Sequence, residues 1–361
     1  MRAARAIALA ALLAAPTVRA QGAVTLIAGG DVVIHRRVAA SAAAHGDAGG
    51  YAWVLDPLRD ELPAAALAFA NLETPLTERF RRPANGTPPL LGADPSLAAG
   101  LAAAGFDLVS VANNHALDQT AAGLAETLAA LAAAGLSAAG GGPSPADAER
   151  PAVLVRDGVR VALVAFTDRV NAGPGSRGAS VALSPDGARV VAALRAARAV
   201  ADVVALSIHW SRDFTYAPTA AQRRLARRWI DAGADVILGT GPHVLQPVER
   251  LASPRGEAVV AWSLGNLVSN QGFRHVPDDR SAPRADPERC PFARDGALLR
   301  VTLARRPGGL RVPTLEAVPL WTQNDHDTVR AMPLRAAPEP LRSARRAAIA
   351  AALGPAVTLV D

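Results

Sequence analysis

The sequence contains no lysine, a single cysteine, Cys290, and few aromatic residues, which make up 4% of its 361 positions. One cysteine cannot form a disulfide within the chain, so the folded domain must be stabilised by its apolar core alone. The 38 basic residues are therefore all arginines, and the abundance of alanine, glycine and proline beside them indicates GC-biased codon usage. The arginines are scattered and seldom accompanied by aromatic residues, which argues against nucleic-acid binding.

What the chain does contain is typical of a globular protein. Hydrophobic residues make up 50% of the sequence and charged residues 19%, a balance that excludes intrinsic disorder. Apolar runs typical of strands alternate with helical patterns over the first two-thirds, and strands then dominate. With no repeat and no clear linker, the pattern predicts one α/β domain over residues 21–361, with two sheets or a mixed sheet covered by helices.

Residues 1–20 have the form of a secretory signal peptide. Two arginines among the first five residues precede an apolar run over 6–15, which is too short to span a bilayer. Val18-Arg19-Ala20 then offers small residues for cleavage before Gln21. We therefore expect an exported protein in the periplasm or outside the cell. An uncleaved segment would instead anchor the protein to the membrane.

Polar side chains recur where the expected strands end. The stretch Asn113-Asn114-His115 lies between an apolar strand and an Ala/Leu-rich helix that closes near Gly135. Such side chains are unfavourable in an apolar core because each buried donor and acceptor needs a hydrogen-bond partner. Strand-to-helix switches are also where open α/β sheets bind their ligands. The ends of the other expected strands carry Asp31, Asn71, Glu73, His209, His243 and Asn266.

In a parallel or mixed sheet these strand ends converge on one edge. Carboxylates, imidazoles and carboxamide oxygens are the ligands that hold Mn, Fe, Zn or Mg, and two such ions can generate a hydroxide and stabilise an in-line displacement. A lone histidine at a strand end is more often an ordinary structural residue. The argument therefore rests on the recurrence of polar residues at several strand ends. Loops or helix ends contain His45, His275 and His326, which we interpret as non-catalytic.

Six motifs follow one another along the chain. They are Gly30-Asp31 with Arg36, Ala70-Asn71-Leu72-Glu73, Ala112-Asn113-Asn114-His115 with Asp118, His209-Trp210, Gly241-Pro242-His243 with Gln246, and Ser263-Leu264-Gly265-Asn266. In this order they resemble the motifs of the CapA family, the capsule or poly-γ-glutamate synthesis proteins related to calcineurin-like metallophosphoesterases. The resemblance covers about residues 24–270, whereas the expected closing hairpin and terminal helix over 295–355 carry no motif.

The resemblance implies a four-layer α/β/β/α sandwich, metallophosphatase-like, with two divalent metal ions at one sheet edge. By the same resemblance, His115 would be the general acid, and Arg36 and Asp118 would contact substrate charge or orient other groups. The implied metal ligands are Asp31, Glu73 as the bridging carboxylate, Asn114, His209 and His243. Asn71, Asn113, Asn266 and His35 would line the pocket.

Three positions depart from the family's usual pattern. His35 stands where the family often has glycine, and Thr120 replaces a usual glycine after Asp118. The family usually has another histidine just before its Pro-His pair, where this chain has Thr240 and Gly241. The second metal would therefore have one ligand fewer.

Two main functions follow from this reading. The first is an exported metal-dependent hydrolase of the CapA type that acts on a phosphoester or an anionic polymer in capsule, poly-γ-glutamate or cell-envelope synthesis. The second is a non-catalytic protein that binds a polyanion during capsule polymer export, alongside capsule-assembly membrane proteins. A structural protein with a vestigial site is a third.

Overall fold

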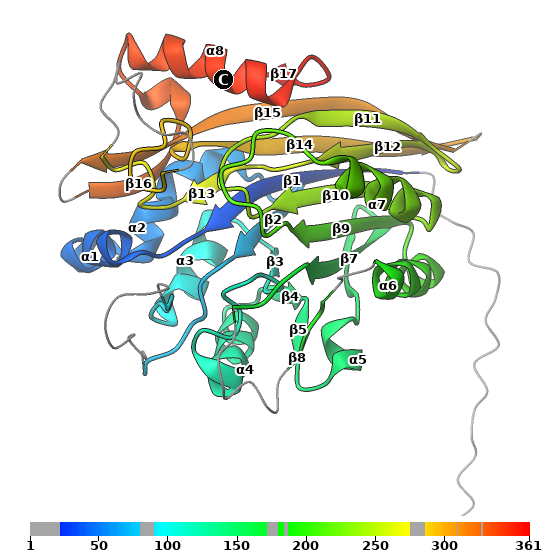
Figure 1. The fold of residues 1–361 in the computed structure, drawn as a ribbon, viewed down its shortest axis with the longest axis horizontal. Coiled ribbons are helices and arrows are strands. Elements are labelled where there is room, and N and C mark those ends of the chain that lie inside the picture. The colour runs from blue at the N-terminus through cyan, green and yellow to red at the C-terminus, as the bar shows by residue number, and fades with distance from the viewer. Residues whose placement is uncertain are drawn as a thin grey trace, which may run out of the picture.

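The computed structural model describes residues 22–79, 90–171, 180–183, 187–274, 286–307, 309–325 and 328–361. The expected signal peptide, His275 and His326 lie outside these ranges. Within them a mixed sheet of fifteen strands runs through the molecule in the order β4-β3-β2-β1-β14-β15-β12-β10-β9-β7-β6, with four further strands attached along its course (Figure 1). The sheet carries helices on its outer faces (Figure 1), so the predicted α/β class is confirmed.

The strands follow the apolar runs of the sequence. They are β1 (Ala23–Val32), β2 (Leu67–Leu72), β3 (Leu108–Ser110), β4 (Ser137–Ala139), β5 (Gly141–Gly142), β6 (Ala152–Arg156), β7 (Val159–Thr167), β8 (Ser180–Val181), β9 (Val203–His209), β10 (Val236–Thr240), β11 (Val248–Ser253), β12 (Gly256–Ala261), β13 (Asn266–Val268), β14 (Asp295–Arg306), β15 (Gly309–Asp325), β16 (Thr328–Pro333) and β17 (Thr358–Leu359).

Most of the helices end at or just before a glycine or proline, whereas α6 ends at Val200 ahead of Ala201-Asp202. They are α1 (Arg36–Ala44), η1 (Gly46–Ala48), α2 (Tyr51–Leu55), η2 (Asp56–Glu61), α3 (Ser96–Ala104), α4 (Thr120–Ala133), α5 (Pro145–Ala148), α6 (Ala188–Val200), α7 (Ala220–Asp231), η3 (Leu334–Ala336) and α8 (Leu341–Leu353). None of the helices in the described part of the chain is long and apolar enough to cross a membrane.

The layering follows from the alternation of side chains along β7, β9 and β10. In β9, Val203 and Ala205 face the large core shared with β1, β2 and β14, whereas Val204 and Leu206 pack with α6 and α7. Because side chains alternate along a strand, this half of the sheet is covered by helices outside and by the other half inside. The ends of the strand order also approach each other, because β4 contacts β6 and β7. The arrangement is therefore helix, sheet, sheet, helix, as expected.

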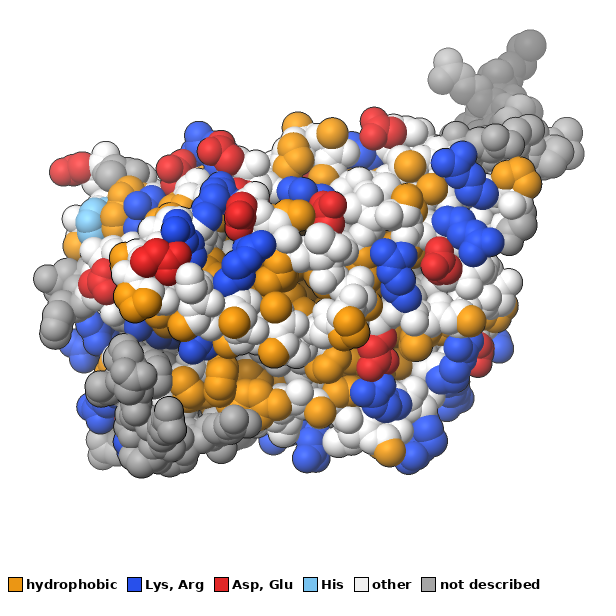
Figure 2. Space-filling model, turned by 90° about the horizontal axis from the view of Figure 1, so that it is seen from above, with side chains coloured by type: hydrophobic (Ala, Val, Ile, Leu, Met, Phe, Trp, Pro, Cys, Tyr) orange, Lys and Arg blue, Asp and Glu red, His pale blue; other side chains and the backbone are white. Residues whose placement is uncertain are grey.

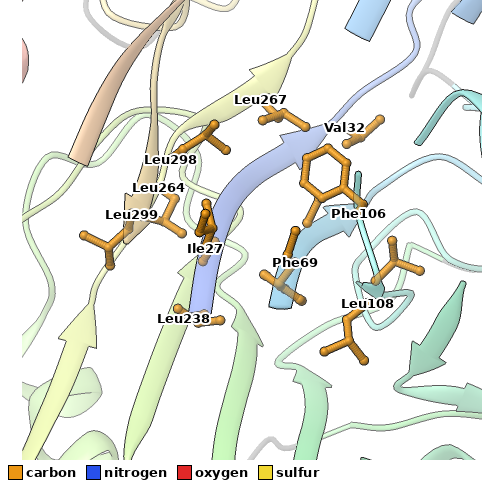
Figure 3. Packing of buried hydrophobic residues seen from close by; sticks show 14 of the residues in the cluster. Ile27, Val32, Phe69, Phe106, Leu108, Leu238, Leu264, Leu267, Leu298 and Leu299 are labelled. Atoms are coloured by element: carbon orange, nitrogen blue, oxygen red, sulfur yellow. The ribbon is translucent and has the colours of Figure 1, made fainter. Parts of the chain in front are cut away.

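The inner core brings together strands that are far apart in the chain. Figure 3 shows Ile27 of β1 between Leu238, Leu264 and Leu299, with Phe69 of β2 beside it. Each of these side chains is buried. Burying one such apolar side chain contributes about 1.5–3 kcal/mol, so this core fixes β1 against both halves of the sheet and positions its C-terminal end.

The helix α7, which packs on the outer side of the sheet, shows how the local sequence determines where a helix begins. Thr219 caps it, because its hydroxyl accepts from the Gln222 backbone N–H at 3.2 Å and the Gln222 side chain accepts from the Thr219 N–H at 2.7 Å. Such a capping box stabilises a helix start by about 1 kcal/mol. Trp229 and Ile230 are buried under the helix, while its arginines face outward.

Arginine side chains on the face shown in Figure 2 are dispersed among acidic ones rather than gathered in one field. This agrees with the scattered arginines of the sequence.

Candidate metal centre

The strand register places the polar residues of the motifs side by side. Asp31 on β1 lies opposite Asn71 on β2, and on its other side opposite Asn266, the first residue of β13. In the other half of the sheet, His209 on β9 lies opposite Thr240 on β10. In the sequence, Gly29-Gly30 after an apolar run predicts a loop that exposes Asp31, and this prediction is wrong, because β1 continues through Val32 and buries Asp31 completely.

Three side chains form the centre of the site. One ligand atom each of Asp31, Glu73 and His209 lies within 4.8 Å of the others, and all three residues are buried. His209 Nε2 lies 3.2 Å from Glu73 Oε1, and His243 Nε2 lies 3.7 Å from the same oxygen. Both Glu73 oxygens and both His209 ring nitrogens lack a hydrogen-bond partner. Orphaned buried polar atoms are costly, and one such atom of Glu73 and one of His209 lie close enough to Asp31 to share a single ion.

The residues present fit a divalent metal ion. Carboxylate and imidazole groups are the donors that zinc, manganese and iron accept, and a bound cation would satisfy the Glu73 carboxylate and one ring nitrogen of His209. The Asn114 side-chain oxygen is also buried without a partner, as a ligand for a second ion would be. The expected ligand set is thus buried at one edge of the sheet, whereas the number and identity of ions stay predictions.

The orientation of His243 is set by Asn266. The Asn266 amide nitrogen donates to the carbonyl oxygens of His243 and Ala293 at 3.3 and 2.8 Å and to the Gln271 side-chain oxygen at 2.9 Å. Its oxygen therefore faces His243 Nδ1 at 3.1 Å and must accept. In the neutral ring the proton then sits on Nδ1, which leaves Nε2 free as a ligand.

Asp31 is held by three donors. Its Oδ1 accepts from the Asn71 amide at 2.8 Å, and its Oδ2 accepts from the Gly241 backbone N–H at 3.0 Å and lies 3.2 Å from His243 Nδ1. Asn113 extends this chain, because its amide donates to Asn71 Oδ1 at 3.4 Å and to the Leu72 carbonyl at 2.8 Å. We expected Asn71, Asn113 and Asn266 to line the pocket, and these bonds give them a second role in orienting the ligands.

The charges of the site shift one another's pKa values. Burial lowers the pKa of His243, but the carboxylates of Glu73 and Asp31 outweigh it and raise the pKa to about 10. Burial also lowers the pKa of His209, but the neighbouring Glu73 carboxylate outweighs this effect and raises the pKa. Burial would raise the pKa of Asp31, but His243 holds it below the usual value. In the metal-free site the carboxylates thus favour the protonated form of both imidazoles.

His115 and Asp118 form a separate pair beside the centre. His115 Nδ1 lies 2.7 Å from Asp118 Oδ2, which also accepts from the Leu91 backbone N–H at 2.7 Å. With Nδ1 bonded to the carboxylate, His115 Nε2 is left to exchange a proton with a substrate. Asp118 is therefore placed to orient His115, while the general-acid role stays a prediction.

The departures from the family pattern have local causes. Gly241 has φ +99°, and a Cβ there would lie 2.5 Å from the Trp210 carbonyl oxygen and 2.9 Å from His209 Cε1. The backbone leaves no room for a histidine side chain at that position, and the Gly241 N–H instead binds Asp31. Thr120 has φ +68°, a conformation that suits glycine.

The third departure, His35, packs beside the site. Its Nδ1 accepts a long hydrogen bond from the Asn270 backbone N–H at 3.3 Å. Burial, then His243 and His115, lowers the pKa of His35 to about 4, so its ring is neutral. Arg36 follows it as the exposed first residue of α1.

One rim residue was missed from the sequence. Arg169 follows β7, and its backbone is fixed because the Thr167 hydroxyl donates to its carbonyl at 2.8 Å. Two residues further on, the Asn171 N–H donates to the Asn114 carbonyl at 2.7 Å. The exposed Arg169 thus lies two residues before a backbone contact with Asn114. Its only sequence signal was its place just after a strand, which a search for metal ligands does not select.

Comparison with known proteins places this geometry in a family. Residues 25–271 match the family model described as bacterial capsule synthesis protein PGA_cap. Since the match covers more than half of the chain, the protein belongs to this family of bacterial capsule synthesis proteins, as the motifs predicted.

Particular relatives are similar over part of their length. The chain is 34% identical over 175 residues to the PGA biosynthesis protein CapA of Bacillus subtilis, covering 48% of this chain and 45% of that one. It is 30% identical over 222 residues to a probable polyglutamine synthesis accessory protein of Mycobacterium tuberculosis, covering 58% and 57%. The chain thus spans about half the length of these curated relatives. A phosphatase structure from Mycoplasma pneumoniae aligns with a TM-score of 0.48 at 14% identity, covering 87% of this chain and 96% of that one.

Proposed function

We propose that the protein is an exported, divalent-metal-dependent hydrolase that cleaves a phosphoester or an anionic polymer in the synthesis of capsule, poly-γ-glutamate or another cell-envelope polymer. The observation that carries the proposal is the set of orphaned, buried atoms on Glu73 and His209 that face Asp31. A divalent ion held there supplies Lewis-acid polarisation of the bond to be cleaved. Export is proposed from the form of residues 1–20.

The chain's own residues supply the remaining chemistry. His115, oriented by Asp118, stands beside the centre with Nε2 available to protonate a leaving group. Exposed Arg36, Arg169 and Arg212 follow the C-terminal ends of β1, β7 and β9, where the site lies. Guanidinium groups bind carboxylates and phosphates in a bidentate manner, so this rim favours an anionic substrate.

The test is hydrolysis of bis-p-nitrophenyl phosphate and of poly-γ-glutamate with Mn²⁺, Zn²⁺ or Mg²⁺ and with chelator. We expect turnover that needs metal and falls by about 10²-fold or more in His115→Ala. His45→Ala is the matched control, because His45 stacks on Trp53 and binds the Ser41 carbonyl away from the site. Turnover that survives chelation, or that is equal in both variants, would refute the proposal.

The arginines at the rim also favour a second function, binding of a polyanion without cleavage. The two functions separate in the same assay. Polymer binding in the presence of chelator, with no turnover under any metal, would favour the binding protein.

A further inference from the structure

A hollow of about 490 Å³ lies between α6 and α7, on the outer side of the sheet. Four arginines line it, namely Arg195 of α6 and Arg224, Arg227 and Arg228 of α7. A single acidic side chain, Asp231, faces them. All four arginines are exposed, and the hollow is shallow enough for an extended ligand to enter.

Within the described part of the chain, the charge of this hollow is not neutralised by acidic side chains. Asp231 is already engaged, because its Oδ1 lies 2.6 Å from Arg227 Nη2. No side-chain hydrogen bond or ion pair is found for Arg195, Arg224 or Arg228 within the residues that the structure describes. Three guanidinium groups therefore stand together with free donors.

The other arginines of the same two helices behave differently. Outside the hollow, Arg189 pairs with Glu149, Arg198 with Asp235 and Arg223 with Glu249. If the arginines only reflected codon bias on solvated helix faces, paired and unpaired ones would be mixed. Within the described residues, the three without a side-chain partner instead lie together in this hollow, beside Arg227 with its partner Asp231, which points to a ligand that supplies further negative charge.

The lining favours carboxylates in a flexible chain over nucleic acid. The remaining lining residues are Val191 and Ala232, so the hollow offers no aromatic ring on which bases could stack. Arginine binds carboxylate through two parallel N–H···O bonds. We infer that the α6–α7 hollow binds an anionic polymer whose repeating unit carries a carboxylate, at a place separate from the metal centre.

The topology relates this surface to the centre. Because α6 leads into β9 and α7 connects the parallel strands β9 and β10, both helices run antiparallel to these strands. Their N-terminal ends therefore lie at the edge where His209 is placed, and the hollow extends away from it. The inference deepens the proposed function and rests on it for the link to a polymer. The hollow would hold a polymer chain while another part of it reaches the site.

The experiment measures binding of poly-γ-glutamate to the whole protein by fluorescence anisotropy at low and high salt. The variant Arg224→Glu/Arg228→Glu reverses two charges in the hollow. The control Arg306→Glu/Arg311→Glu reverses two exposed arginines near the β14–β15 turn, which gives the same change in net charge. The neutral variant Arg224→Gln/Arg228→Gln repeats the test without added acidic groups, should the reversal disturb folding.

We expect the hollow variants to weaken polymer binding by about tenfold or more at 50 mM salt, and the control to stay near the wild type. In the hollow variants, hydrolysis of a small phosphoester is expected to stay unchanged. Binding of the polymer to the wild type is expected to be the same with and without chelator. Equal weakening in hollow and control variants, or none in either, would overturn the inference. So would polymer binding that is lost on chelation, since the polymer would then bind at the metal centre.

Two further results distinguish this inference from nucleic-acid binding and from the hydrolase proposal. If the hollow variants kept poly-γ-glutamate but lost a single-stranded oligonucleotide, the ligand would be nucleic acid and the inference wrong. If polymer binding at the hollow held while no metal-dependent hydrolysis were found, the hydrolase proposal would fail and the inference would stand.

Discussion

Replacing Gly241 by alanine tests whether the backbone at this point positions the metal ligands. The added Cβ would lie 2.5 Å from the Trp210 carbonyl oxygen and 2.9 and 3.0 Å from His209 Cε1 and Nε2. The left-handed φ of +99° adds about 1–2 kcal/mol for any residue with a Cβ. Shifting a packed backbone carbonyl adds about 1–3 kcal/mol. We therefore expect Gly241→Ala to lower the free energy of unfolding by about 2–5 kcal/mol.

The same substitution should weaken metal binding. Metal–ligand distances tolerate only about 0.2 Å, and the His209 ring must move by more than that to clear the new methyl group. We expect metal affinity to fall by about 10–100-fold, as when other groups that orient a ligand are changed. Isothermal titration calorimetry with Zn²⁺ or Mn²⁺ measures the affinity, and chemical denaturation of the metal-free protein measures stability.

Gly135→Ala is the matched control. Gly135 also has a left-handed φ, +79°, but a Cβ there would meet nothing within 4 Å. It should therefore cost only the backbone strain of about 1–2 kcal/mol and leave metal affinity unchanged. If Gly241→Ala behaved like Gly135→Ala in both assays, the packing of Gly241 against His209 would not position the centre, and the reasoning would be refuted.

Three other predictions concern single features of the site. Thr120→Gly should raise the free energy of unfolding by about 1 kcal/mol, because glycine relieves the strain of φ +68°; an unchanged or lower denaturation midpoint would contradict it. Protonated His243, with a pKa raised to about 10 by Glu73 and Asp31 against the opposing effect of burial, stabilises the metal-free protein fully below pH 6.5, and this stability should be lost as pH rises toward 10. Metal affinity should rise over the same range as protons leave, and thermal melts with and without metal at pH 7 and 9.5 measure both; a flat profile argues against the pairing. Asp118→Asn should lower kcat by about 10²-fold with little change in KM, and a change in KM alone would contradict an orienting role toward His115.

The fold could be predicted from the sequence because its elements are locally marked. The run over 36–44 predicts a helix, and Asp157-Gly158 between two apolar runs predicts a hairpin; the structure has α1 and the β6–β7 hairpin at these places. The strand β13 was missed, since its three residues begin at Asn266, directly after Gly265, and carry no periodic pattern. Its pairing with β1 depends on the long-range packing of Leu264 and Leu267, which no local signal records.

The site, like the fold, could be predicted only in part. The residue types at strand ends indicated which side chains converge, since parallel strands bring their C-terminal ends together. The hydrogen bonds that orient them could not be predicted, because the Asn266 amide is fixed by Ala293 and Gln271 through a separate loop. The burial of Asp31 was also misjudged, because Gly29-Gly30 looks like a turn and instead continues β1.

The central claim is that Glu73 and its neighbours hold divalent metal, and elemental mass spectrometry of the purified protein tests it most directly. The wild type, Glu73→Gln and the remote control Glu249→Gln would be incubated with Mn²⁺, Fe²⁺ or Zn²⁺ and freed of unbound ions. Glu249 is part of an exposed pair with Arg223, so its loss leaves the site intact. The account predicts stoichiometric metal in the wild type and the control and a loss in Glu73→Gln. No metal in the wild type, or equal metal in all three proteins, would contradict it.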